Sequence, residues 1–110
     1  MKKVKITVLK RTLQKDLASE YGVDNLALCS RHKEEQTFIT GYEKPAGFCD
    51  EAWKAISHYV FALAHGAPAN EWFYQNWIKT PGVAICSCND GLRPVIFKLE
   101  STEEEATLPW

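Results

Sequence analysis

Residues 50–66 read DEAWKAISHYVFALAHG, and this stretch decides the fold. Its apolar residues recur at spacings of three and four, which is the period of a helix with a buried face. Asp50 is a favourable N-cap residue, and Gly66 is typical of the position that follows a helix. The pattern predicts a helix over residues 51–65 that is apolar on nearly all sides and central in the molecule.

Four other segments have the composition of β-strands. Val4, Ile6 and Val8 alternate with more polar neighbours, as in a strand with one buried face. β-Branched and aromatic residues indicate three more strands later in the chain. The predicted strands cover residues 3–10, 36–40, 83–88 and 94–100.

The predicted fold class is α+β, with a small, mainly antiparallel sheet packed on the helix over residues 51–65. A short N-terminal helix is expected over residues 13–21, with Thr12 as its N-cap. No repeat or domain boundary interrupts the chain, so residues 1–110 are predicted to form a single domain. Residues 101–110 are expected to be a flexible acidic tail.

The connection between the last two predicted strands contains Asp90 and Gly91. An Asp-Gly pair is a strong signal for a tight hairpin turn that requires positive φ. The sequence therefore predicts that residues 83–88 and 94–100 form a hairpin.

Charge and hydropathy exclude several function classes. The 110 residues include 13 Lys plus Arg and 14 Asp plus Glu, for a net charge of −1, so no nucleic-acid partner is expected. No segment approaches the roughly 18 apolar residues that a membrane span needs. A cytoplasmic protein is predicted, in which the four cysteines are free thiols, metal ligands or redox groups rather than structural disulfides.

Two motifs stand out in the chain. Residues 45–53 (PAGFCDEAW) contain the pattern GFC-x-x-A-W, and residues 88–98 (CNDGLRPVIFK) contain C-x-D-G-x-R-P-V-x-F. Both resemble a family of small uncharacterised proteins of bacteria and archaea, in which the two cysteines before the turn are often adjacent, whereas Ser87 separates them here. That family has no established activity, so the resemblance implies a compact unit and supplies no catalytic residues.

The cysteine pattern suggests a metal site. In a strand, Cys86 and Cys88 point to the same face with Cα atoms about 6.6–6.8 Å apart, at the outer limit for a disulfide, so ligation is favoured over bridging. Cys29 and His32 form a second pair at C-x-x-H spacing, and Cys49 lies at the start of the main helix. A site for zinc or another thiolate-preferring metal would combine Cys86, Cys88 and Cys29 with either Cys49 or His32.

Two other uses of the cysteines stay open. A thiol at a helix N-terminus has a lowered pKa, so a thiol-redox site with Cys49 as the most reactive group is one alternative. Ordinary buried thiols are the other, because cysteine is among the most buried residue types.

Asp90 and Arg93 are candidates for turn chemistry or for contact with an anion. Asp90 before a glycine is typical of a residue that caps its own turn, and Arg93 can pair with Asp90 or bind an anion. The aromatic residues of segment 72–77 predict a different function, a non-catalytic protein that self-associates or binds a partner through this loop.

Overall fold

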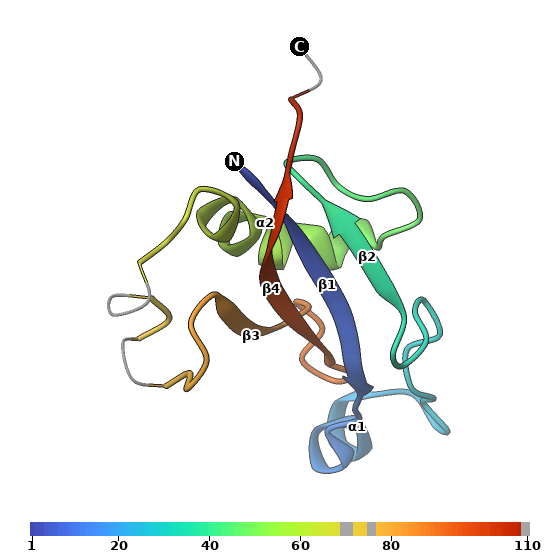
Figure 1. The fold of residues 1–110 in the computed structure, drawn as a ribbon. Coiled ribbons are helices and arrows are strands. Elements are labelled where there is room, and N and C mark those ends of the chain that lie inside the picture. The colour runs from blue at the N-terminus through green and yellow to red at the C-terminus, as the bar shows by residue number, and fades with distance from the viewer. Residues whose placement is uncertain (69–71, 75–76, 109–110) are drawn as a thin grey trace.

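The computed structural model describes residues 1–68, 72–74 and 77–108 of the chain. The elements, in chain order, are β1 (Lys2–Arg11), α1 (Lys15–Tyr21), β2 (Thr37–Thr40), α2 (Asp50–Ala64), β3 (Val83–Ser87) and β4 (Val95–Glu105) (Figure 1). This is the predicted α+β fold. Within the described ranges, no helix is both long enough and apolar enough to span a membrane.

The strands form one antiparallel sheet in the order β2-β1-β4-β3. The long strands β1 and β4 lie in the middle, and the short strands β2 and β3 form the edges. Val4, Ile6 and Val8 of β1 are completely buried, as their alternation with polar residues predicted. Phe97 and Leu99 of β4 are also fully buried and pair with Val8 and Ile6, so the two central strands share one apolar face.

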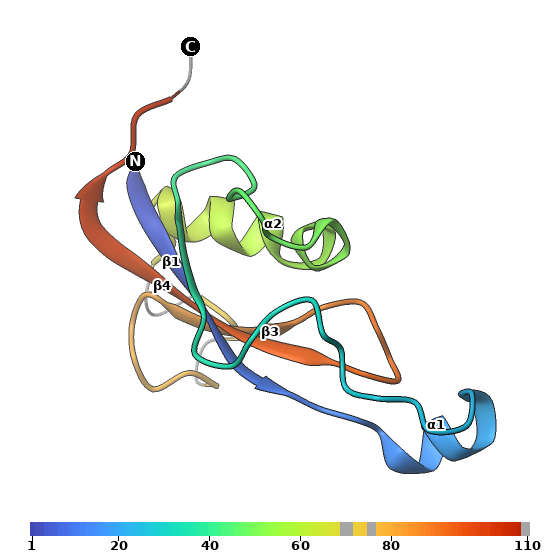
Figure 2. The same cartoon turned by 90° about the vertical axis from the view of Figure 1, so that its right-hand side faces the viewer.

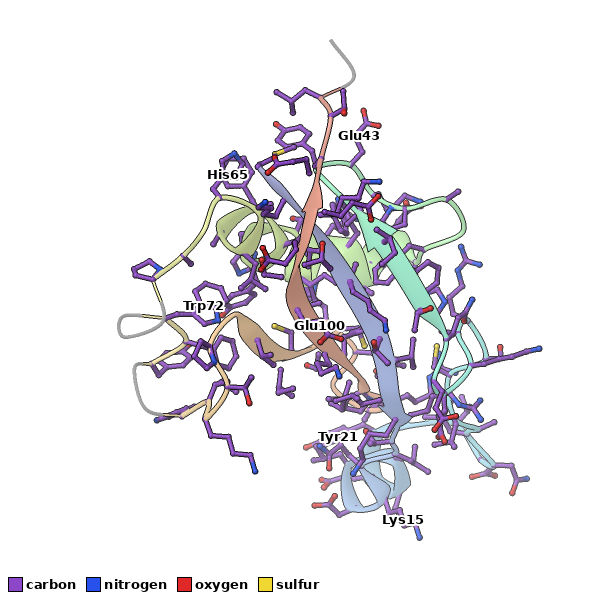
Figure 3. The ribbon with its side chains drawn as sticks, in the orientation of Figure 1. Lys15, Tyr21, Glu43, His65, Trp72 and Glu100 are labelled. Atoms are coloured by element: carbon purple, nitrogen blue, oxygen red, sulfur yellow. The ribbon has the colours of Figure 1, made fainter. Side chains whose placement is uncertain are left out.

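Helix α2 covers that apolar face, and no helix among the described residues lies on the other face of the sheet (Figure 2). Its buried residues follow the three- and four-residue spacing seen in the sequence; they are Ala52, Ile56, Val60, Leu63 and Ala64. Glu100 of β4 lies on the opposite, uncovered face (Figure 3). The helix is less enclosed than predicted, since Phe61 is half exposed on its outer side.

The helix boundaries differ from the predicted ones. Cys49, not Asp50, is the N-cap of α2, and Gly66 adopts positive φ just after its end. Helix α1 begins at Lys15, two residues later than predicted. The reason is that Thr12 does not cap it, because the Thr12 hydroxyl donates a hydrogen bond to the Pro94 carbonyl at 2.7 Å.

The prediction of a flexible acidic tail from residue 101 is wrong for residues 101–105, which continue β4. These residues pair with the start of β1, where Lys2 lies opposite Glu105. The ammonium of Lys2 is 2.6 Å from the Glu105 carboxylate, and that of Lys3 is 2.8 Å from Glu104. The acidic segment is therefore held by backbone pairing with β1 and by ion pairs with Lys2 and Lys3. Residues 109–110 of the predicted tail lie outside the described part of the chain.

Phe48 packs between helix α2 and the sheet, so replacing its side chain tests the fold. It is fully buried, with ring centroids 5.0 Å from Phe38 and 5.4 Å from Phe97. We expect Phe48→Ala to lower the free energy of unfolding by about 3–5 kcal/mol, measured by urea denaturation. The control Phe61→Ala removes a half-exposed ring and should cost much less; equal losses in the two variants would contradict this packing.

Candidate functional site

One cavity brings together most of the residues singled out in the sequence. It has a volume of about 360 Å³, and its walls include Cys29, His32, Cys49, Cys88, Asp90 and Arg93. These residues come from the α1–β2 loop, from the start of α2 and from the β3–β4 connection. All three segments lie on the side of the sheet that α2 covers (Figure 2).

Cys86 does not line this cavity. It pairs with Phe97 in the sheet and lines a second cavity, of about 550 Å³, beside the aromatic residues Tyr59 and Phe73. Burial raises the pKa of the Cys86 thiol to about 12, so this thiol is protonated at neutral pH. Cys88 lies just beyond the end of β3 and lines both cavities.

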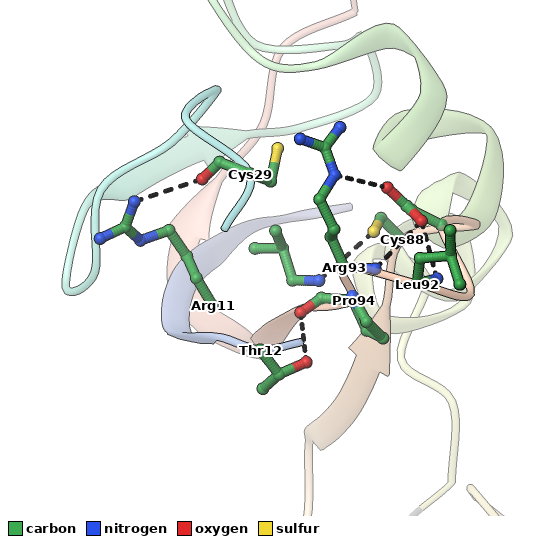
Figure 4. Close-up of polar contacts among 9 residues, drawn as sticks. Arg11, Thr12, Cys29, Cys88, Leu92, Arg93 and Pro94 are labelled. Carbon is green, nitrogen blue, oxygen red and sulfur yellow. Dashed lines mark hydrogen bonds and ion pairs between the residues drawn. The ribbon is translucent and has the colours of Figure 1, made fainter. Parts of the chain in front are cut away.

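The backbone of the β3–β4 connection holds Cys88 in place. The Cys88 N–H donates to the Val95 carbonyl at 3.1 Å, and the Val95 N–H donates to the Cys88 sulfur at 3.4 Å. Arg93 lines the same cavity as Cys29 and Cys88, with its Nε directed to the Asp90 carboxylate (Figure 4). Cys29 is held in turn by Arg11, whose Nη1 donates to the Cys29 carbonyl at 3.3 Å.

Asp90 stabilises the connection between β3 and β4 by accepting hydrogen bonds from the residues that follow it. Its Oδ1 accepts the N–H groups of Leu92 and Arg93 at 2.9 and 3.1 Å, and its Oδ2 accepts Arg93 Nε at 3.3 Å. The predicted tight turn is wrong, because the connection spans residues 88–94 and Gly91 does not adopt positive φ.

The charge of Asp90 is stabilised in this position. Partial burial alone would raise the pKa of its carboxyl group, but the N–H bonds from Arg93 and Leu92 and the Arg93 guanidinium outweigh burial and lower it. The predicted pairing of Asp90 with Arg93 is confirmed. The Nη groups of Arg93 form no hydrogen bond to the described residues, so they remain available to the cavity.

His32 is a neutral, buried histidine. Only 3% of it is exposed, and its ring packs 5.2 Å from Phe38 and 5.0 Å from Phe48 between centroids. Its Nε2 accepts the backbone N–H of Cys49 at 3.1 Å, so the ring proton belongs to Nδ1, which is buried without a geometrically acceptable partner among the described residues. Burial and the nearby charge of Arg31 lower the His32 pKa, and the Gln36 side chain opposes them only in part.

The predicted metal site is not assembled by these residues. In the part of the chain that the structure describes, no three His, Cys, Asp or Glu side chains lie close enough together to hold a metal ion. The Nε2 lone pair of His32 already accepts the Cys49 N–H, which removes that atom as a ready ligand. Cys86 lines the other cavity without reaching this one.

Two charged residues of the cavity were missed in the sequence, Arg31 and Glu51. The Glu51 carboxylate is 2.6 Å from the Lys54 ammonium. Arg31 is exposed and forms no ion pair with the described residues. No signal for Arg31 was present in the sequence, because the loop between α1 and β2 has no periodicity that places its side chains.

The aromatic loop forms a separate feature. Trp72 is anchored beside β3 (Figure 3), where its Nε1 donates to the Val83 carbonyl at 2.9 Å. Tyr74 and Trp77 are largely exposed, and their ring centroids are 4.6 Å apart. Residues 75–76 of the predicted interaction segment lie outside the described part of the chain.

Comparison with known proteins does not identify the chain: no family model, no curated protein and no solved structure matches it. The resemblance of residues 45–53 and 88–98 to a family of small bacterial and archaeal proteins stays a prediction. The chemistry of the cavity is therefore inferred from its own residues.

The buried His32 predicts a pH dependence of stability. Its folded pKa is lower than the unfolded value, so unfolding takes up a proton at mildly acidic pH. The His32 contribution to the free energy of unfolding is complete above the ordinary value of 6.5 and is lost as the pH falls from there through the folded pKa. We expect urea denaturation of the native protein to show this decline between pH 7 and 5.

His32→Gln is the matched variant, since a Gln oxygen can accept the Cys49 N–H but does not titrate. Its stability should change less over the same pH range. Asp50 and Asp90 also have lowered pKa values, but the ordinary value of both is 3.8, so their contributions are lost at lower pH. The same slope in both proteins would show that His32 does not cause the decline.

Proposed function

We propose that this protein is a thiol-redox protein whose cavity cysteines exchange with small-molecule disulfides. The observation that carries the proposal is that Cys29, Cys49 and Cys88, from three segments distant in the sequence, line the same cavity as free thiols. Ordinary packing is the competing explanation, but all three are only partly buried. Access of this kind is what a reactive thiol requires.

The proposed reaction is thiol–disulfide exchange. A cavity thiolate attacks one sulfur of a small disulfide; the bond between its two sulfurs breaks as a new disulfide forms with the protein cysteine. The second half of the small disulfide leaves as a thiolate and takes up a proton from water. Cys49 is one candidate for the attacking thiol, because it lies at the N-cap of α2 and lines the cavity.

The reducing environment of the cytoplasm suits this function, since free thiols persist there. Four free cysteines support that location as part of the proposal.

A second candidate function is self-association through the aromatic loop. It is favoured by the exposure of Tyr74 (61%) and Trp77 (71%), because exposed aromatic rings commonly anchor interfaces. A monomer mass by light scattering at high protein concentration would contradict it.

The redox proposal predicts unequal reactivity of the four cysteines. Native protein is treated with iodoacetamide at neutral pH, and labelling is followed for each cysteine by peptide mass spectrometry. We expect Cys86 to react at least about 10-fold more slowly than the fastest cavity cysteine, because only a thiolate reacts and the Cys86 pKa is raised to about 12. Bis(2-hydroxyethyl) disulfide should likewise form its adduct at a cavity cysteine.

Variants locate the reactive thiol and provide the control. Cys86→Ser should leave the rate of adduct formation unchanged. Among Cys29→Ser, Cys49→Ser and Cys88→Ser, the variant that replaces the attacking thiol should form no adduct. Elemental analysis of the same untagged protein shows whether a bound metal masks the thiols. Equally slow labelling of all four cysteines in metal-free protein would overturn the proposal.

A further inference from the structure

The cavity that holds the three thiols is also lined by two guanidinium groups. Arg31 and Arg93 both line it, one from the α1–β2 loop and one from the β3–β4 connection. The two carboxylates in its walls already have partners: Asp90 accepts three N–H groups, and Glu51 is paired with Lys54. His32 is neutral and adds no charge at neutral pH.

Arg31 is the less constrained of the two guanidinium groups. It forms no ion pair with any described residue, and it is exposed. Its charge nevertheless acts at the start of α2. The His32 pKa is lowered mainly by burial and also by Arg31. The Asp50 pKa is lowered mainly by Lys44 and also by Arg31. A guanidinium without a carboxylate partner can bind an incoming anion through two parallel N–H groups.

Arg93 is more firmly positioned. Asp90 holds it through Nε at 3.3 Å, which leaves the two Nη groups without a described partner (Figure 4). The cavity volume of about 360 Å³ is at the small end of the range for ligand sites.

We infer that the disulfides taken up by this cavity carry carboxylates, which Arg31 and Arg93 bind while a cavity thiolate attacks the disulfide sulfur. This inference rests on the proposed function and names its substrate class. The bond changes are those of the exchange reaction: one sulfur–sulfur bond breaks, one forms with the protein, and the leaving thiolate takes up a proton. Asp90 is a positioning residue, because it acts through Arg93.

Three small disulfides that differ in charge test the inference. They are 3,3′-dithiodipropionate (two carboxylates), bis(2-hydroxyethyl) disulfide (neutral) and cystamine (two ammonium groups). Rates of adduct formation at the cavity cysteines are measured by mass spectrometry at low ionic strength. Each rate is divided by that for a small free thiol, which removes the intrinsic reactivity of the disulfide.

We expect the normalised rate with the dicarboxylate to exceed that with the neutral disulfide by about 10-fold, because charge-assisted hydrogen bonds hold the anion. Cystamine should be the slowest, and added salt should reduce the difference. Arg31→Gln and Arg93→Gln should each lower the ratio of the dicarboxylate rate to the neutral rate, because a change in thiol reactivity affects both substrates alike and cancels in the ratio. Asp90→Asn should also lower the ratio of the two rates, a readout that a purely structural role would not change.

Lys15→Gln is the matched control, because it removes the same charge from the exposed helix α1 (Figure 3) and Lys15 does not line the cavity. Its ratio should equal that of the native protein. Equal rates for the dicarboxylate and neutral disulfides would overturn this inference and leave the proposed function standing. A loss in Lys15→Gln as large as in the arginine variants would also overturn it, whereas no adduct with any disulfide would overturn the proposed function itself.

Discussion

The hydrogen bond from the Cys49 N–H to His32 Nε2 is the interaction on which the arrangement of the cavity depends. It joins the irregular α1–β2 loop to the N-cap residue of α2, and no strand pairing connects these two segments. The His32 ring is also enclosed by Phe38 and Phe48, so the bond lies where water does not compete with it. It therefore ties the loop that carries Cys29 directly to the start of the helix, in addition to the bond from Arg11 to the Cys29 carbonyl.

The sheet provides the rigid support for that arrangement. The central strands β1 and β4 run together along nearly their whole length, and their apolar face is closed by α2. Beyond β1, Thr12 and Gln14 continue to bond the β3–β4 connection through the carbonyls of Pro94 and Leu92. The loop that carries Cys88 is thus hydrogen-bonded to the segment that directly follows central strand β1.

Local patterns in the sequence were sufficient to predict the helices and strands but not to predict which side chains line the cavity. Alternation in β1 and helical spacing in α2 depend on nearby residues, so they could be read directly. The start of β4 was placed one residue early, at Pro94, which has no N–H to contribute to the ladder. The acidic residues 101–105 were assigned to a tail because only their partner β1, about a hundred residues earlier, makes them a strand.

The cavity was predicted in part. Cys29, His32, Cys49 and Cys88 were chosen by residue type and spacing, and they do share a cavity. Cys86 was grouped with them on strand geometry alone, whereas it lies in the second cavity beside Tyr59. The role of Arg31 could not be derived, because residues 22–36 have no periodicity from which to place a side chain.

Cys88 lines both cavities, and this has a consequence for tryptophan fluorescence. A group attached to its sulfur would alter the surroundings of Trp77, which lines the aromatic cavity next to it. In a variant that keeps Trp77 as the sole one of the four tryptophans, the indole emission is therefore expected to report the chemical state of Cys88 without any added dye.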